Sequence, residues 1–160
     1  MGVFLLFFVS PGVAARLRRI VPALWRPLLL LGFPALAAAH EMTVFMSPTC
    51  LCCTKWAKHM RSGGFSGHVV SQQHMGPVKE RIGVPAALRS CHTAVVDGYV
   101  IEGHVPADAV SRLLQERPAV AGLAVPGMPA GAPGMESPRP ERYRILSFDR
   151  GGANTVFELR

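Results

Sequence analysis

The chain has 160 residues, which allows one domain of ordinary size, and its formal net charge is +7. Four of the positive charges are arginines within the first 39 residues, which leaves a net charge of +3 on the rest, where Lys and Arg are interspersed among Asp and Glu. No basic stripe with interleaved aromatic residues stands out, so the composition argues against nucleic-acid binding. The sequence has no evident Gly-x-Ser-x-Gly motif, phosphate-binding loop or pair of carboxylates, which argues against a hydrolase.

Residues 1–39 have the features of a secretory signal peptide. Arg16–Arg19 supplies positive charge, and the apolar stretch from Ile20 to Leu36 is followed by three alanines typical of a cleavage site. A membrane anchor is the alternative, but the apolar run from Leu28 to Ala39 is shorter than the ~20 residues of a spanning helix. We therefore expect export to the periplasm, an oxidising compartment, with no stable membrane span after cleavage and one domain over residues 40–160.

The first predicted elements of this domain lead into a cysteine cluster. Met42–Ser47 is a short β-prone run that ends at Pro48. From Thr49 onward, apolar residues recur at helical spacing with polar residues on the other face, and Gly63 ends the pattern. The thiols are therefore predicted at the start of an amphipathic helix, where backbone N–H groups and the helix dipole favour the thiolate over the thiol.

The following segments predict a small α/β fold. The predicted elements are a strand over 65–71, a helix over 75–82, a hairpin of 94–96 and 99–102 that turns at Asp97-Gly98, and a helix from Pro106 at its first position to Arg117. Their order is that of a thioredoxin-like fold, a small mixed sheet with flanking helices. Folds of this kind often carry a cis-proline near the site, and Val84-Pro85 lies near that place, but the sequence leaves the isomer of its peptide bond open.

The last third of the chain is less regular. Residues 118–140 are rich in Pro, Gly, Ala and Met, which predicts a loop and not a helix. Two short strands are predicted beyond it, Tyr143–Phe148 and Thr155–Leu159, around an Asp-Arg-Gly-Gly turn that begins at Asp149.

Cysteine spacing carries most of the chemistry. Three cysteines lie within Cys50-Leu-Cys-Cys53, and Cys91 follows in Ser90-Cys-His92. Three sulfurs at one turn suit several bridged Cu(I) ions better than one zinc ion, which usually takes two separate pairs of ligands. A disulfide fits comfortably between Cys50 and Cys53, or between one of the three and Cys91. Thiol–disulfide exchange by Cys50 and Cys53, an iron–sulfur cluster and inert structural disulfides are the alternatives.

Two histidines and two methionines are auxiliary candidates. His92 and His104 could bind the metal, orient its ligands through hydrogen bonds, or serve only as structural residues. Met128 and Met135 lie in the Pro/Gly-rich loop, and their thioethers suit Cu(I). The alternative is that these methionines pack over the cysteines as soft apolar cover.

Four segments together resemble the small exported CopG-type copper-resistance proteins. These segments are Cys50-Leu-Cys-Cys53, Ser90-Cys-His-Thr-Ala94, the run from Gly98 to Pro106, and the run from Gly122 to Pro129. The resemblance covers nearly all of the mature chain. One departure is Leu51, where glycine is expected more often and where a bulky side chain could change the loop or shield the metal.

The resemblance implies a specific function. A thioredoxin-like domain would bind copper through Cys50, Cys52, Cys53 and Cys91 as a polynuclear Cu(I)-thiolate cluster in copper resistance. Interconversion of Cu(I) and Cu(II) would make the protein a copper oxidoreductase, and whether it is an enzyme is left open. The expected partners are copper ions and a periplasmic copper chaperone, exporter or electron-transfer protein.

Overall fold

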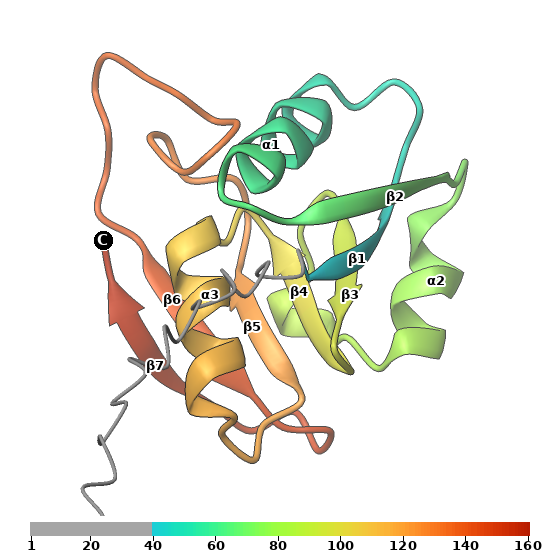
Figure 1. Ribbon diagram of the computed structural model, residues 1–160, viewed down its shortest axis with the longest axis vertical. Coiled ribbons are helices and arrows are strands. Elements are labelled where there is room, and N and C mark those ends of the chain that lie inside the picture. The colour runs from blue at the N-terminus through green and yellow to red at the C-terminus, as the bar shows by residue number, and fades with distance from the viewer. Residues whose placement is uncertain (1–39) are drawn as a thin grey trace, which may run out of the picture. The chain divides into compact units, whose positions relative to one another are not determined.

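Seven strands form one mixed sheet in residues 40–160, the part of the chain that this computed structural model describes (Figure 1). The strands are β1 (Glu41–Met46), β2 (Ser66–Ser71), β3 (Thr93–Val96), β4 (Tyr99–Gly103), β5 (Gly122–Val125), β6 (Arg144–Phe148) and β7 (Asn154–Leu159). The helices are α1 (Leu51–Ser62), α2 (Met75–Ile82) and α3 (Ala107–Glu116), with a short 3-10 turn, η1, at Ala86–Leu88. The predicted signal peptide, residues 1–39, lies outside the described residues.

The strands are ordered β2-β1-β3-β4-β5-β6-β7 across the sheet. Pairing is parallel between β1 and β2 and between β4 and β5, and antiparallel between the other neighbours. The β3–β4 hairpin turns at Asp97-Gly98, and both residues have positive φ, as a tight two-residue turn requires. The predicted mixed α/β fold is confirmed, and the first four strands with their helices are consistent with the thioredoxin-like order.

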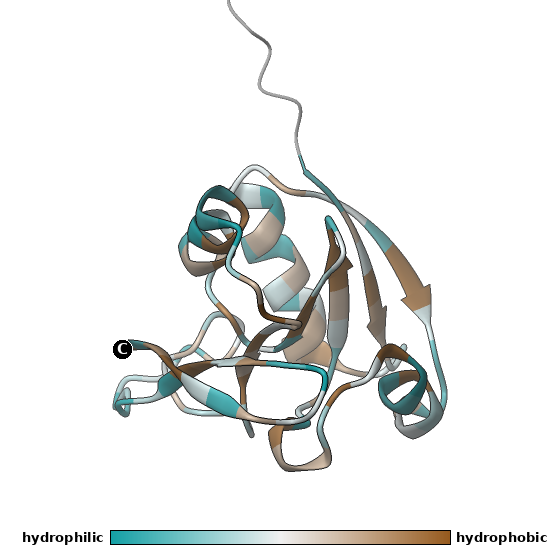
Figure 2. Ribbon diagram, turned by 90° about the horizontal axis from the view of Figure 1, so that it is seen from below, coloured by the Kyte–Doolittle hydropathy of each residue, from teal (hydrophilic) through white to brown (hydrophobic). Residues whose placement is uncertain are grey.

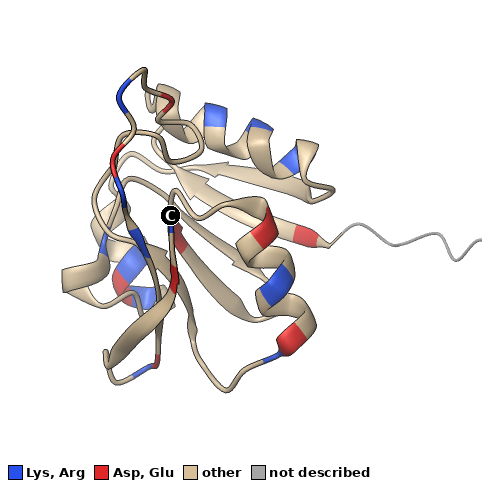
Figure 3. Cartoon of the chain, turned by 90° about the vertical axis from the view of Figure 1, so that its left-hand side faces the viewer, with Lys and Arg blue, Asp and Glu red and all other residues tan. Residues whose placement is uncertain are grey.

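Helices cover both faces of the sheet. Helices α1 and α3 pack on one face, where their apolar side chains join those of β1, β3, β4 and β5 in the main core. The segment from α2 to η1 packs on the other face around a smaller cluster. Figure 2 shows apolar residues concentrated along the central strands and polar residues on the outer sides of the helices. The exposed face of α1 carries a row of cations, Lys55, Lys58 and Arg61 (Figure 3).

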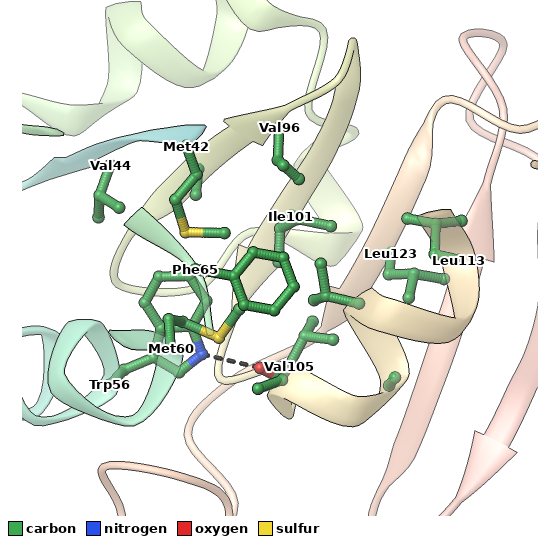
Figure 4. Packing of buried hydrophobic residues seen from close by; sticks show 14 of the residues in the cluster. Met42, Val44, Trp56, Met60, Phe65, Val96, Ile101, Val105, Leu113 and Leu123 are labelled. Carbon is green, nitrogen blue, oxygen red and sulfur yellow. Dashed lines mark hydrogen bonds between the residues drawn. The ribbon is translucent and has the colours of Figure 1, made fainter. Parts of the chain in front are cut away.

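Trp56 fixes helix α1 to the rest of the core. Its ring is fully buried, and its Nε1–H donates a hydrogen bond of 2.8 Å to the carbonyl of Val105 (Figure 4). Met42, Met60 and Phe65 pack around it. Because a buried indole N–H needs an acceptor, this bond sets the position of α1 against the segment that leads into α3.

Two expectations from the sequence were wrong in detail. Residues 118–140 are not wholly a loop, because β5 lies within them and pairs with β4 and β6. All four residues of β5 are buried, so the strand lacks the polar alternation that would reveal it. Pro106 is the N-cap of α3 and not its first residue. The described residues contain no cis peptide bond, so Val84-Pro85 is trans.

Gly122 makes the pairing of β5 with β4 possible, and Gly122→Ala tests this. A Cβ at this position would lie inside the contact distance of the Val100 backbone. We expect the variant to lose about 3 kcal/mol or more in free energy of unfolding, because rigid backbone atoms must move. Gly67→Ala is the matched control, since a Cβ there makes only an ordinary contact with Met42, at 3.8 Å, and strand β2 should gain about 0.5–1 kcal/mol. Equal effects in urea denaturation would contradict this packing.

Candidate metal centre

The first turn of α1 presents three cysteines together. Strand β1 ends at Met46, and a turn closed by the Cys50 N–H and the Ser47 carbonyl (3.1 Å) brings the chain to the helix. Cys50 is the N-cap, and its Sγ accepts a hydrogen bond of 3.3 Å from the backbone N–H of Cys53. The predicted placement of the thiols at a helix start is therefore confirmed. Leu51 is 80% exposed, so its side chain does not shield the cysteines.

All four predicted cysteines come together in space. Cys91 lies between η1 and β3, and its Sγ is 4.0 Å from that of Cys52. Cys52 Sγ is 3.4 Å from Cys50 Sγ, and Cys50 is joined to Cys53 by a disulfide. The four sulfurs all lie within 4.8 Å of one another, so they could share metal ions. Cys52 and Cys91 are free thiols.

A second group shares Cys91 with the first and adds His92 and His104. Cys91 Sγ lies 3.2 Å from His92 Nδ1 and 3.1 Å from His104 Nε2. His104 Nδ1 lies 2.8 Å from the Pro133 carbonyl, which can only accept, so Nδ1 carries the proton in the neutral ring. The Nε2 lone pair therefore faces the sulfur, which is the orientation of a histidine ready to bind metal.

Burial controls protonation in this group. Burial, and then the neighbouring Cys52, raise the pKa of Cys91 to about 11, so the metal-free protein holds a thiol there at neutral pH. Burial, followed by His104 and Lys79, lowers the pKa of His92 well below 6.5. Burial also lowers the pKa of His104. A soft metal ion that binds here must displace the Cys91 proton but meets two neutral imidazoles.

A buried ion pair that sequence reasoning missed supports the Cys91 segment. Lys79 Nζ of α2 donates to Glu102 Oε1 at 2.6 Å and to Thr93 Oγ1 at 2.9 Å. Thr93 Oγ1 donates to Glu102 Oε2 at 2.6 Å, and the backbone N–H of Ser90 donates to Glu102 Oε1 at 2.5 Å. Both charged side chains are almost fully buried. The signal available in the sequence was one carboxylate, Glu102, within an apolar strand.

The Pro/Gly-rich loop packs over the first turn of α1. Gly134 lies so close to α1 that a Cβ there would be 2.6 Å from the carbonyl oxygen of Cys52 and 2.9 Å from the backbone nitrogen of Trp56. Ser90 Oγ donates to the Gly127 carbonyl, which joins the loop to the Cys91 segment. Met135 next to Gly134 is half-buried, whereas Met128 is 55% exposed. The role of these methionines, as copper ligands or as apolar cover, stays a prediction.

Comparisons with known proteins find one family and two similar solved structures. A family described as "Protein of unknown function, DUF411" matches residues 88–135. Two solved structures, "Copper resistance protein copG- Form 1" and "Copper resistance protein copG- Form 2", are each 40% identical and superpose with a TM-score of 0.72. Each match covers 76% of this chain and 98% of the solved chain. The search of curated proteins found no match.

Glu102→Gln tests the buried ion pair. The substitution leaves the Lys79 ammonium buried without a counter-charge, so we expect a loss of about 3–5 kcal/mol in free energy of unfolding. Glu80→Gln is the matched control, because Glu80 is 68% exposed and pairs with Arg89 at the surface, where the loss should stay below about 1 kcal/mol. Similar small losses for both variants in urea denaturation would show that the buried pair contributes no more to the free energy of unfolding than the surface pair does.

The buried histidines predict a pH dependence for the metal-free chain. Since the pKa of folded His92 lies below the 6.5 of an ordinary histidine, the unfolded chain binds more protons once the pH falls below about 6.5. The contribution of His92 to the free energy of unfolding should therefore be constant above pH 7 and decrease between pH 6.5 and 5, by up to about 1.4 kcal/mol per pH unit. His92→Gln should reduce that slope in urea denaturation at each pH. An unchanged slope in the variant would remove His92 as the cause.

Proposed function

The chain belongs to the CopG family of copper-resistance proteins, and on that premise we propose that it holds several Cu(I) ions in a thiolate cluster. The ligands are Cys50, Cys52, Cys53 and Cys91. A copper-binding role follows already from the similarity to copper-resistance proteins together with the cysteine group. The oxidation state of the copper and the number of ions are the parts that we propose.

One observation carries the proposal, the convergence of four sulfurs within 4.8 Å of one another. Metal–sulfur bonds are about 2.3 Å long in zinc sites, so one ion can join two sulfurs up to about 4.6 Å apart. Because each sulfur has several neighbours at such distances, each can bridge more than one ion. Thiolates select Cu(I) over harder ions, and the N–H groups at the start of α1 stabilise the negative sulfurs.

The site is in its oxidised form in this structure, because Cys50 and Cys53 are joined by a disulfide. A disulfide sulfur is not a thiolate, so this form offers only Cys52 and Cys91 as anionic ligands. Opening the disulfide consumes two electrons and two protons and yields two further thiols. The complete cluster therefore requires the reduced chain, and Cu(I) then replaces the thiol protons.

Location and partners belong to the same proposal. The predicted signal peptide and the family membership support a periplasmic protein that receives copper from a chaperone, exporter or electron-transfer partner. In the described residues, no helix is long and apolar enough to cross a membrane. Met128, 55% exposed, offers a thioether to incoming Cu(I). Electron exchange with a partner would interconvert Cu(I) and Cu(II) and make the protein a copper oxidoreductase.

Thiol–disulfide exchange by Cys50 and Cys53 is the second candidate, and the disulfide itself favours it. The two cysteines form a Cys-x-x-Cys pair at a helix start, the usual place of a reactive dithiol. Cys52 argues against this function, because its Sγ lies 3.4 Å from Cys50 Sγ, where a third thiol invites scrambling of the disulfide.

Copper stoichiometry separates the two functions. Residues 40–160 lie in one compact unit, and the match covers the solved relatives almost completely, so the chain without its first 39 residues is the sample. Titrated anaerobically with Cu(I) after reduction, it should bind more than one copper per chain and lose all four free thiols. Cys52→Ser should bind fewer ions, whereas Leu51→Gly, which changes an exposed neighbour, should retain them.

The opposite pattern would favour thiol exchange. If the reduced chain holds no stable copper, and Cys52→Ser catalyses disulfide exchange as well as the unaltered chain does, the cluster is ruled out. In that case Cys50 and Cys53 alone carry the activity.

A further inference from the structure

We propose that Cys91, His92 and His104 form a site for one copper ion, which shares Cys91 with the cluster and remains available when Cys50 and Cys53 are joined in the disulfide. The inference rests on the proposed function for the choice of copper as the metal. The three ligand atoms lie within 4.8 Å of one another, and none of them belongs to the disulfide. Oxidation of the dithiol would thus reduce the copper capacity of the protein but not abolish it.

The distances suit a single ion. Cys91 Sγ is 3.1 Å from His104 Nε2 and 3.2 Å from His92 Nδ1. With a metal–sulfur bond of about 2.3 Å and metal–nitrogen bonds of about 2.0 Å, one ion contacts a sulfur and a nitrogen separated by up to about 4.3 Å. The two imidazole rings are nearly perpendicular, at 89°, with centroids 5.0 Å apart, so they can direct nitrogens to one point from different sides.

Each histidine is held in place by its neighbours. His104 is oriented by the hydrogen bond from Nδ1–H to the Pro133 carbonyl, which leaves Nε2 free for a metal. The His92 ring packs against Trp56 of α1 with ring centroids 4.3 Å apart, and its backbone carbonyl accepts from the N–H of Gly103 at 3.0 Å. A site built from such fixed side chains needs little rearrangement to receive an ion.

His92 presents one ring nitrogen to the Cys91 sulfur. Its ring is fully buried, and within residues 40–160 its only polar side-chain contact is the one between Nδ1 and Cys91 Sγ. Nε2 has no hydrogen-bond partner among these residues. A metal ion bound at Nδ1 would therefore replace this single contact and break no other hydrogen bond of the ring.

The donor set favours copper. Two imidazoles and one thiolate in a trigonal arrangement are the ligands of known mononuclear copper sites, in which a weak fourth ligand tunes the metal. Cys52 is the next sulfur, 4.0 Å from Cys91 Sγ. Cys91 belongs to both groups. In the reduced chain its sulfur would bind copper of the cluster, and in the oxidised chain it would bind the single ion together with the two histidines.

The test uses the oxidised chain without its first 39 residues, with two free thiols confirmed before titration. We expect it to bind one Cu(I) in competition with a chromogenic chelator. Cys52→Ser, the matched control, should still bind one ion, whereas Cys91→Ser should bind none. His104→Gln should bind at least 100-fold more weakly. Absence of copper from the oxidised chain would overturn the proposal, as would loss of copper in Cys52→Ser with retention in His104→Gln.

A second measurement identifies the ligands directly and needs no variant. X-ray absorption of the oxidised chain with one copper should show a first shell of about two nitrogens and one sulfur. A shell of two sulfurs alone would place the ion between Cys52 and Cys91 and would overturn the site.

These results separate this inference from the cluster. If the reduced chain binds several ions and the oxidised chain binds none, the cluster stands and the second site is ruled out. If the oxidised chain binds one ion and the reduced chain binds no more than one, the second site stands and the polynuclear cluster is ruled out.

Discussion

The carboxylate of Glu102 is the constraint on which the geometry of the site depends. It accepts hydrogen bonds from Lys79 of α2, Thr93 of β3 and the backbone of Ser90, so one buried group joins a helix, two strands and the segment that carries Cys91. A charge buried this deeply is tolerated only when it is paired and its oxygens are satisfied. The pairing therefore resists displacement of Ser90, and with it of Cys91, relative to the start of α1.

The alternating direction of neighbouring side chains then places His92 and Thr93 on opposite sides of the sheet. Adjacent residues of an extended segment point to opposite sides, so His92 packs against Trp56 on the α1 side while Thr93 joins the ion pair on the α2 side. Cys91 lies in a bend before β3, so it does not follow this alternation and meets the sulfurs at the helix start. The site thus combines a redox-sensitive part at the start of α1 with a part next to β3 that contains neither cysteine of the disulfide.

The sequence predicted most elements and the four cysteines, because turn residues, periodicity and the thiol spacing are local signals. Strand β5 was missed since a strand buried on both faces has no alternation, and its Pro/Gly-rich flanks resemble a loop. The ion pair between Lys79 and Glu102 depends on packing between distant segments, which one sequence does not reveal. For the same reason the sequence left open whether Cys50 pairs with Cys53, and whether His92 and His104 meet Cys91.

The central claim is that four cysteines hold several copper ions as one cluster. Copper X-ray absorption of the fully reduced chain, loaded with Cu(I) to saturation, tests it most directly. The account predicts a first shell dominated by sulfur together with scattering from neighbouring copper atoms at short distance. Isolated copper ions with no copper neighbour would contradict it, because four sulfurs within 4.8 Å of one another would then serve one ion and not a cluster.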